Sequence, residues 1–443
     1  MRGHLLSARF GRAGIPGAAA ALTLAVLPAV EARAAAAATS RPPACAVNAW
    51  VASWTASPTD SFPTFDPTLQ RTPSTLTDDT VRMVITPHLG GHTLRLHLSN
   101  RLANRPLDIG HVTIARQDPN GAATSAPVTV TFGHHENAML PAKQDIVSDP
   151  VTVDVTALAP LAVSIYLPHT STPVTEHWNA NATSYYADSG SGDLTGMTSG
   201  APFVHPTYSW FYVDGLDVQA RAHTLVAFGD SITDGFVGGS PLSLPVSSSV
   251  TDKNERYPDF LQQRITAAGL KLSVANSGIG SNQLLSTLGL MTGPSGLSRY
   301  DADALQVPAA SGVIVLEGIN DLGLGHAKAA AIIAGYRQLI ARTHAAGKKI
   351  WLGTITPAAN ALIDGVLLAP RSEIDRQRIN AWIRAQHLAD GFIDFDAALR
   401  DPAHPSQLLP AYSGPDHLHP NAAGYEQMAQ TVPLSALAGI ACR

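Results

Sequence analysis

The C-terminal half of the chain has one serine in a distinctive polar segment. Ser231 lies in residues 229–235 (Gly-Asp-Ser-Ile-Thr-Asp-Gly), directly after the apolar run 225–228. A serine hydroxyl on a loop at the carboxyl end of a strand can be a nucleophile, provided that a base takes its proton. Taken alone, such a serine is more often a helix N-cap. The chain has no Gly-x-Ser-x-Gly, so the nucleophile elbow of the α/β-hydrolase fold is absent.

A carboxylate and an imidazole near the C-terminus supply a candidate base. Asp416 and His419 are three positions apart, so their side chains can lie side by side across a turn. The carboxylate would accept from one ring nitrogen and leave the other facing the serine hydroxyl. A second interpretation takes His417 and His419 with Asp416 as a metal site. That site lacks clustered further ligands, because the nearest histidines, His404 and His387, lie in ordinary surroundings.

Two polar loops are candidates for stabilising an oxyanion. Asn320, in residues 318–321 (Gly-Ile-Asn-Asp), follows the apolar run 313–316, and its amide can donate to a tetrahedral intermediate. An asparagine at a strand end also simply favours a turn. Residues 276–282 (Asn-Ser-Gly-Ile-Gly-Ser-Asn) follow the run 272–275, and backbone N–H groups of such a loop can complete an oxyanion hole. Each signal is weak alone, but their joint occurrence in this order is specific.

The elements that must position these residues alternate between strand and helix after residue 221. Mostly apolar runs predict strands at residues 225–228, 272–275, 313–316, 350–352 and 392–395. Helical periodicity predicts helices over residues 257–268, 327–345, 373–388 and 421–430. The alternation predicts a three-layer α/β domain, in which a parallel sheet is covered by helices on both faces. Reactive groups in such sheets gather at the carboxyl ends of the strands.

The preceding half has the pattern of antiparallel β-structure. From residue 50 to about residue 218, apolar residues alternate with others in short runs, as at residues 81–85, 94–98, 128–132, 151–155 and 163–167. Turn signals such as Gly90-Gly91 separate the runs, and no long helix is indicated. The pattern predicts a β-sandwich-like accessory domain over residues 50–220, followed by the α/β domain over residues 221–443.

The first residues have the features of an export signal. Arg2, Arg9 and Arg12 precede an apolar stretch over residues 14–30, and Ala34 ends a motif of small residues that a signal peptidase cleaves. We expect a signal peptide over residues 1–34 and a leader over residues 35–49. The apolar run is short for a membrane span. The mature protein is therefore expected to be secreted or periplasmic, with no stable membrane insertion.

The chain has only two cysteines, Cys45 and Cys442, at the two ends of the expected mature protein. Because export leads to an oxidising compartment, a disulfide between them is favoured over two free thiols. Such a bond would stabilise the fold by about 2–4 kcal/mol.

The composition suits two globular domains and argues against a nucleic-acid binder. Hydrophobic residues make up 45% of the 443 residues and charged residues only 14%, enough apolar surface for real cores. The formal net charge is -5 and no run of lysine or arginine occurs, whereas nucleic-acid binders usually show a basic face.

Taken together, the polar segments resemble those of the GDSL or SGNH hydrolase family. The matching segments are residues 229–235, 276–282, 318–321 and 416–419, in the family's order. The resemblance implies a flavodoxin-like SGNH hydrolase domain with Ser231 as nucleophile, His419 as base and Asp416 as the residue that orients it. It also implies an oxyanion hole made by the backbone N–H of Ser231 and the amide of Asn320. No metal or organic cofactor is implied.

One position departs from the family pattern. The family usually has a glycine at the position of Ser281, whose backbone N–H serves the oxyanion hole. Ser281 keeps an N–H but loses the freedom of glycine at positive φ, so Gly280 is the alternative donor.

The N-terminal region also resembles, more loosely, a β-rich segment that precedes this domain in some secreted bacterial members. Residues 50–54 and 90–100 carry that resemblance. It leaves open whether the region binds carbohydrate, shapes the substrate cleft or stabilises the enzyme. Its aromatic residues can line a sugar site, although a buried aromatic core is their more common use. These residues are Trp178, Tyr185, Tyr186, Tyr208, Trp210, Phe211 and Tyr212.

The sequence thus predicts a secreted serine esterase that forms a covalent acyl-enzyme. Its expected substrate is a small-molecule or glycan ester. Short-chain acyl esters and acetylated carbohydrates are the two classes expected. The alternative is a carbohydrate-binding protein on a catalytically weakened esterase scaffold, which the departure at Ser281 would explain. The oligomeric state is not predicted.

Overall fold

The computed structural model describes residues 45–46, 48–61, 73, 75–119, 121–171, 175–239, 250–288, 293–361 and 372–442. The predicted signal peptide and most of the predicted leader lie outside these residues. Residues Pro42–Arg443 belong to one compact unit.

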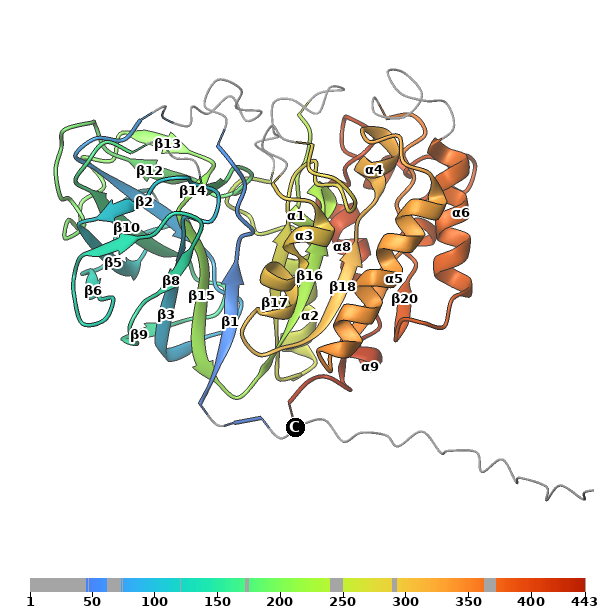
Figure 1. Cartoon of the computed structure of the whole chain (residues 1–443), viewed down its shortest axis with the longest axis horizontal. Coiled ribbons are helices and arrows are strands. Elements are labelled where there is room, and N and C mark those ends of the chain that lie inside the picture. The colour runs from blue at the N-terminus through green and yellow to red at the C-terminus, as the bar shows by residue number, and fades with distance from the viewer. Residues whose placement is uncertain are drawn as a thin grey trace, which may run out of the picture. The chain divides into compact units, whose positions relative to one another are not determined.

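The C-terminal part of the chain is built on a five-stranded parallel sheet (Figure 1). The spatial order is β17-β16-β18-β19-β20, which in chain order is the 2-1-3-4-5 arrangement of flavodoxin-like folds. The predicted strands are confirmed, except that the last one ends at residue 393, because residue 394 caps the following helix and residue 395 begins it. The strands are β16 (His223–Gly229), β17 (Leu272–Gly278), β18 (Ala310–Leu316), β19 (Lys349–Gly353) and β20 (Gly391–Ile393).

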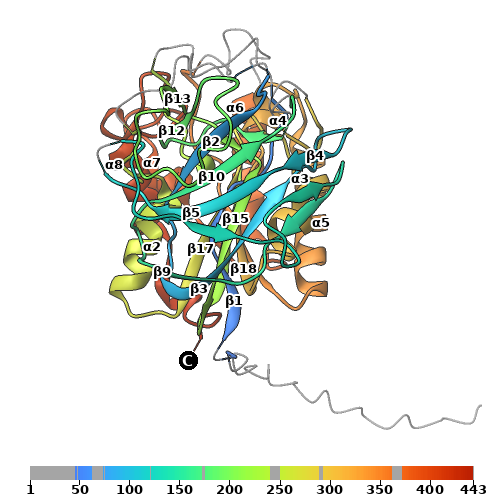
Figure 2. The same cartoon turned by 90° about the vertical axis from the view of Figure 1, so that its left-hand side faces the viewer.

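Helices cover both faces of this sheet, as the three-layer prediction requires. Helices α2, α7 and α8 pack together on one side, and α3 and α5 lie on the other (Figure 2). The four predicted helices correspond to α2 (Tyr257–Ala267), α5 (Ala329–Ala345), α6 (Ser372–Ala385) and α8 (Ala422–Thr431). Shorter helices are α1 (Ser231–Asp234), α3 (Gly296–Tyr300), α4 (Ile319–Gly323), α7 (Phe395–Leu399) and α9 (Leu434–Leu437). Two of these, α1 and α4, are the turns that directly follow β16 and β18.

The N-terminal part consists of antiparallel strands, as predicted. One sheet has the order β1-β15-β3-β8 with β9 also paired to β3, and a second has the order β13-β12-β2-β10-β5-β6. Two strand pairs, β4-β7 and β11-β14, complete the region. The strands of the first sheet are β1 (Ala49–Thr55), β3 (Gly91–Ser99), β8 (Asp145–Val147), β9 (Val151–Val155) and β15 (Val213–Ala220). Those of the second are β2 (Asp79–Ile85), β5 (His111–Arg116), β6 (Val128–Val130), β10 (Leu161–Leu167), β12 (Ser184–Tyr186) and β13 (His205–Thr207). The pairs comprise β4 (Leu107–Ile109), β7 (Ala138–Leu140), β11 (Glu176–His177) and β14 (Trp210–Phe211).

Three of the seven aromatic residues named above belong to the buried core of the β-rich region. Trp210, Phe211 and Tyr212 are buried, and the Trp210 ring stands edge-on to Trp54 with ring centroids 4.8 Å apart. This core is separate from the one that surrounds the parallel sheet. The prediction of a buried aromatic core is therefore confirmed for Trp210, Phe211 and Tyr212.

Strand β1 joins the β-rich region to the parallel sheet. It pairs with β15 on one side and lies beside β17 on the other. The Thr55 hydroxyl donates to the carbonyl of Asn276 at 2.8 Å, and the Ala52 N–H donates to the carbonyl of Pro308 at 3.3 Å. The side chain of Ala52 is part of the core of the parallel sheet. The two parts of the chain therefore share a bonded boundary.

The predicted disulfide is present. Cys45 and Cys442 are bonded, with their Cα atoms 5.7 Å apart, and the backbone N–H of Cys442 donates to the carbonyl of Lys271. The bond ties the strand that enters the β-rich region to the end of the α/β part. Among the described residues, no helix is long and apolar enough to cross a membrane.

Loss of the disulfide should lower stability. Replacing both Cys45 and Cys442 by serine is expected to lower the free energy of unfolding by about 2–5 kcal/mol, because the unfolded chain gains the entropy that the cross-link removed. Thermal melting with and without a reductant measures this effect. The reductant should lower the Tm of the wild-type protein and leave the double variant unchanged; equal Tm values for all samples would contradict the expectation.

Candidate active site

The backbone around Ser231 explains the types of its neighbours. Strand β16 ends at Gly229, where an added Cβ would lie 2.1 Å from the Thr233 hydroxyl oxygen and 2.4 Å from the Leu316 carbonyl oxygen. Asp230 is the N-cap of α1 and accepts the N–H of Ile232 at 2.9 Å. Ser231 itself is thereby held at the first helical position, at the carboxyl end of a central strand.

The three predicted catalytic side chains lie within hydrogen-bond distance of one another. Ser231 Oγ is 2.7 Å from Nε2 of His419, and Nδ1 of His419 is 2.6 Å from Oδ2 of Asp416. The other oxygen of Asp416 accepts the N–H groups of Leu418 and His419, both at 3.0 Å. This turn explains the spacing of three residues, because one carboxylate folds the loop and orients the ring. All three side chains are nearly buried, with Ser231 6%, His419 4% and Asp416 2% exposed.

His417 does not join this arrangement. It has φ +59° and is exposed, whereas His419 is buried. In the part of the chain that the structure describes, one group of three His, Cys, Asp or Glu side chains is close enough to share a metal ion. That group is Cys45, Cys442 and His223, and its two sulfur atoms form the disulfide.

The two candidate oxyanion loops contact each other. Nδ2 of Asn320 donates to the carbonyl of Asn282 at 3.0 Å, which leaves its second amide hydrogen for another acceptor. The N–H of Ser231, at the first position of α1, has no acceptor within the helix. These groups lie on α1, on α4 and in the loop after β17, all at the carboxyl edge of the sheet.

The positive φ in the loop after β17 falls on Ser281, at +59°, and not on Gly280. Ser281 therefore adopts the conformation for which a glycine is usual, although a side chain makes it less favourable. Gly280 is required for a different reason. An added Cβ there would lie 2.0 Å from a ring carbon of Trp178, so the indole rests directly on the backbone of the loop.

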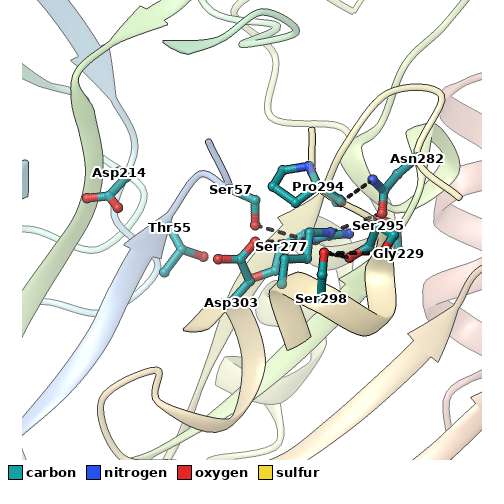
Figure 3. A network of polar contacts seen from close by, with 12 residues as sticks. Thr55, Ser57, Asp214, Gly229, Ser277, Asn282, Pro294, Ser295, Ser298 and Asp303 are labelled. Atoms are coloured by element: carbon teal, nitrogen blue, oxygen red, sulfur yellow. Dashed lines mark hydrogen bonds and ion pairs between the residues drawn. The ribbon is translucent and has the colours of Figure 1, made fainter. Parts of the chain in front are cut away.

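A buried arginine that no sequence motif indicates, Arg299, holds the catalytic loops together. The Arg299 guanidinium donates to the carbonyls of Gly229 and Ser277, both at 2.8 Å, and to the side chain of Asn282 at 3.0 Å. It also forms ion pairs of 3.2 Å with Asp303 and Glu317. Figure 3 shows Gly229, Ser277, Asn282 and Asp303 gathered from separate elements, with Ser57 of the β-rich region beside them.

The same region buries several carboxyl groups. Burial raises the pKa of Asp230 to about 7 and raises the pKa of Glu317 well above its ordinary value. Burial also raises the pKa of Asp321, whose oxygens accept the backbone N–H groups of Leu284 and Leu285 at 2.7 and 2.9 Å. Asp321 thus fixes the backbone that follows residues 276–282, which we call the oxyanion loop. The aspartate after Asn320 in residues 318–321 therefore has a structural role.

Two aromatic side chains lie beside the base. The Phe236 ring is edge-on to the His419 ring with centroids 4.7 Å apart, and Trp178 is 5.7 Å from Phe236. Trp178 comes from the β-rich region, whereas Phe236 lies two residues after α1 (Ser231–Asp234), which we call the nucleophile turn. Trp178 is only 6% exposed, so this one aromatic of the β-rich region belongs to the surroundings of the active site.

The chain's similarity to known proteins agrees with this geometry. Residues 227–427 match the model of the GDSL-like Lipase/Acylhydrolase family. This part of the chain belongs to that family. The matched residues include all three side chains of the Ser231–His419–Asp416 arrangement. The enzyme is a carboxylic ester hydrolase.

Several solved structures resemble the chain at low identity. The aryl esterase of M. smegmatis is 16% identical, with 49% of this chain and 96% of that chain covered and a TM-score of 0.39. Est24, a carbohydrate acetylesterase from Sinorhizobium meliloti, is 16% identical, with coverages of 47% and 94% and a TM-score of 0.37. A family two carbohydrate esterase from Clostridium thermocellum is 13% identical, with coverages of 81% and 91% and a TM-score of 0.36. Among curated proteins, none matches the chain.

Removal of the Asn320 amide should impair turnover more than binding. Asn320→Ala is expected to lower kcat for an ester by about 10²–10³, with little change in KM, because the lost donor acts on charge that develops in the transition state. Steady-state kinetics over a range of ester concentrations measures this. A kcat within threefold of the wild-type value would remove Asn320 from the oxyanion hole.

Replacement of the buried Asp230 should change how stability depends on pH. Its pKa is about 7 in the folded protein and 3.8 ordinarily, so between about pH 4 and 7 the folded state holds a proton that the unfolded state has lost. This group therefore destabilises the wild-type fold progressively as the pH rises through that window. Asp230→Asn keeps an acceptor for the Ile232 N–H and does not titrate. Its Tm relative to wild type is expected to be higher at pH 8 than at pH 5; a pH-independent difference would contradict this assignment.

Proposed function

We propose that this protein hydrolyses carboxylic esters by acyl transfer to Ser231. The observation that carries the proposal is the continuous chain of hydrogen bonds from Ser231 Oγ through His419 to Asp416, with distances of 2.7 and 2.6 Å. A serine hydroxyl is a weak nucleophile until a base accepts its proton, and His419 Nε2 is the nearest such base.

In the first half of the reaction, His419 takes the proton as Ser231 Oγ attacks the ester carbonyl. Asp416 stabilises the imidazolium that forms and keeps Nε2 directed at the serine. The oxyanion receives hydrogen bonds from the backbone N–H of Ser231, from the second amide hydrogen of Asn320 and from the backbone N–H of Ser281. His419 then protonates the leaving alcohol, and an acyl-enzyme remains.

In the second half, water attacks the acyl-enzyme with the same groups in the same roles. His419 accepts a proton from water and returns it to Ser231 Oγ as the acid leaves. None of these steps uses a metal ion or an organic cofactor.

The proposed substrate is a small-molecule or glycan ester with a short acyl group, including acetylated carbohydrate. Phe236 and Trp178 support this choice, because their rings fill space beside His419 and the oxyanion loop. We also propose that the protein acts outside the cytoplasm, after cleavage of a signal peptide near Ala34. The Cys45–Cys442 disulfide supports that proposal, since such bonds persist in oxidising compartments.

Turnover of p-nitrophenyl acetate and of longer acyl homologues, by wild type and Ser231→Ala, tests the proposal. Loss of the nucleophile is expected to lower kcat by about 10⁶. Activity should fall with acyl length and should survive a chelator. Equal turnover by both proteins would refute the role of Ser231. Tight glycan binding without turnover in either protein would favour a binding protein on an esterase scaffold.

A further inference from the structure

One short segment of the β-rich region lies against the nucleophile turn, α1. Residues 177–181 begin at the end of β11, which pairs with β14 inside the β-rich region. The carbonyl of Ala180 accepts a hydrogen bond from Arg256, and the carbonyl of Asn181 accepts the N–H of Asp252 at 2.9 Å. The amide of Asn181 donates to the carbonyl of Gly235 at 2.7 Å. The segment is therefore bonded to Gly235, which follows α1, and to Asp252 and Arg256, which precede α2.

The tightest contacts of the segment are with Asp234, the last residue of α1. Nε2 of His177 is 3.0 Å from Oδ1 of Asp234, and Nδ2 of Asn179 donates to Oδ2 at 2.9 Å. The other ring nitrogen of His177 donates to the carbonyl of Ser57 at 2.9 Å. All three side chains are buried. The β-rich region thus supplies a donor to each oxygen of this carboxylate.

These contacts bear on the nucleophile because α1 is a single helical turn. It has four residues, begins at Ser231 and ends at Asp234. One turn of helix is too short to be stable by itself, so its geometry depends on the groups that hold its ends. Asp230 holds the first end from within the turn, and His177 with Asn179 hold the last end from outside.

Trp178, which lies between His177 and Asn179 in the sequence, contacts other parts of the active site. The Trp178 ring lies on the backbone of Gly280 in the oxyanion loop and beside Phe236, which contacts the His419 ring. Three consecutive residues of the β-rich region therefore touch the nucleophile turn, the oxyanion loop and the aromatic neighbour of the base.

We propose that His177 and Asn179 are positioning residues that set the orientation of Ser231 through Asp234. The β-rich region is then a part of the active site, and not a separate binding module. This proposal rests on the proposed esterase function. Its consequence is that a change in the β-rich region, remote in sequence from the catalytic segments, lowers kcat selectively.

The same boundary contains a matched control. Nε2 of His88 is 2.9 Å from Oδ1 of Asp259, and its Nδ1 donates to the carbonyl of Val274 at 2.7 Å. This buried pair also joins a histidine of the β-rich region to an aspartate of the α/β part. However, Asp259 belongs to α2 and not to the nucleophile turn. Loss of His88 should therefore weaken the boundary without disturbing Ser231.

The test compares His177→Ala with His88→Ala in the full chain. Both variants are expected to melt at a lower temperature than wild type. Only His177→Ala is expected to lower kcat for p-nitrophenyl acetate, by about 10–100-fold with KM within twofold, since small displacements of reacting groups have effects of that size. His177→Gln, which keeps a donor for Asp234, should recover part of the kcat. Equal kcat losses in His177→Ala and His88→Ala would overturn the proposal.

Asn179→Ala is the substitute test if His177→Ala does not fold. This variant removes only one neutral hydrogen-bond donor from Asp234. It should lower kcat in the same selective way, and a kcat equal to that of wild type would overturn the proposal. A wild-type protein without Ser231-dependent turnover would overturn the proposed function, and this proposal with it. An active wild type whose His177 and Asn179 variants keep full kcat would overturn this proposal alone.

Discussion

Parallel pairing of β17, β16 and β18 is the constraint on which the active site depends. Because the carboxyl ends of parallel strands meet at one edge of the sheet, the loop after each strand opens onto the same region. Ser231 follows the end of β16, Ser281 lies in the loop after β17, and Asn320 follows the end of β18. Asp416 and His419 come from a loop before α8 and complete the arrangement. Four segments spread over nearly two hundred residues of sequence thereby reach one site.

Buried ionic and polar contacts hold the loops at this shared edge of the sheet in fixed positions. Arg299 donates to carbonyls at the ends of β16 and β17 and to the side chain of Asn282. The backbone carbonyl of Asn282 in turn accepts a hydrogen bond from Asn320. Burying a guanidinium is costly unless it is paired and fully bonded, and Asp303 and Glu317 supply the opposite charge. Burial also raises the pKa values of nearby carboxyl groups, Asp230 and Glu317 among them, although the positive charge of Arg299 opposes this shift. The catalytic loops are thus held by interactions that are strong in the dry interior.

The sequence predicted what depends on local pattern and missed what depends on long-range contacts. Hydrophobic periodicity gave the parallel strands and the four main helices, and the segment around Asp416 and His419 gave the base, because each of these is encoded within a few residues. Arg299 lies in a segment without a recognisable motif. Its role depends on contacts with three loops that are distant in the sequence, so no local pattern could predict it. The sequence offers a sugar site or, more commonly, a buried core for Trp178 and the other aromatics of its region. Nothing near Trp178 in the sequence indicates its contact with Gly280. The family pattern left Ser281 and Gly280 as alternatives in the loop after β17, and the positive φ falls on Ser281.

The central claim is that His419 activates Ser231 as a nucleophile, and covalent labelling tests it most directly. Wild-type protein and His419→Ala are treated with a serine-directed fluorophosphonate, and the modified peptide is identified by mass spectrometry. One adduct is expected, on Ser231, and it should form rapidly in the wild type and very slowly in the variant. An adduct on another serine, or equally fast labelling of Ser231 without His419, would contradict it.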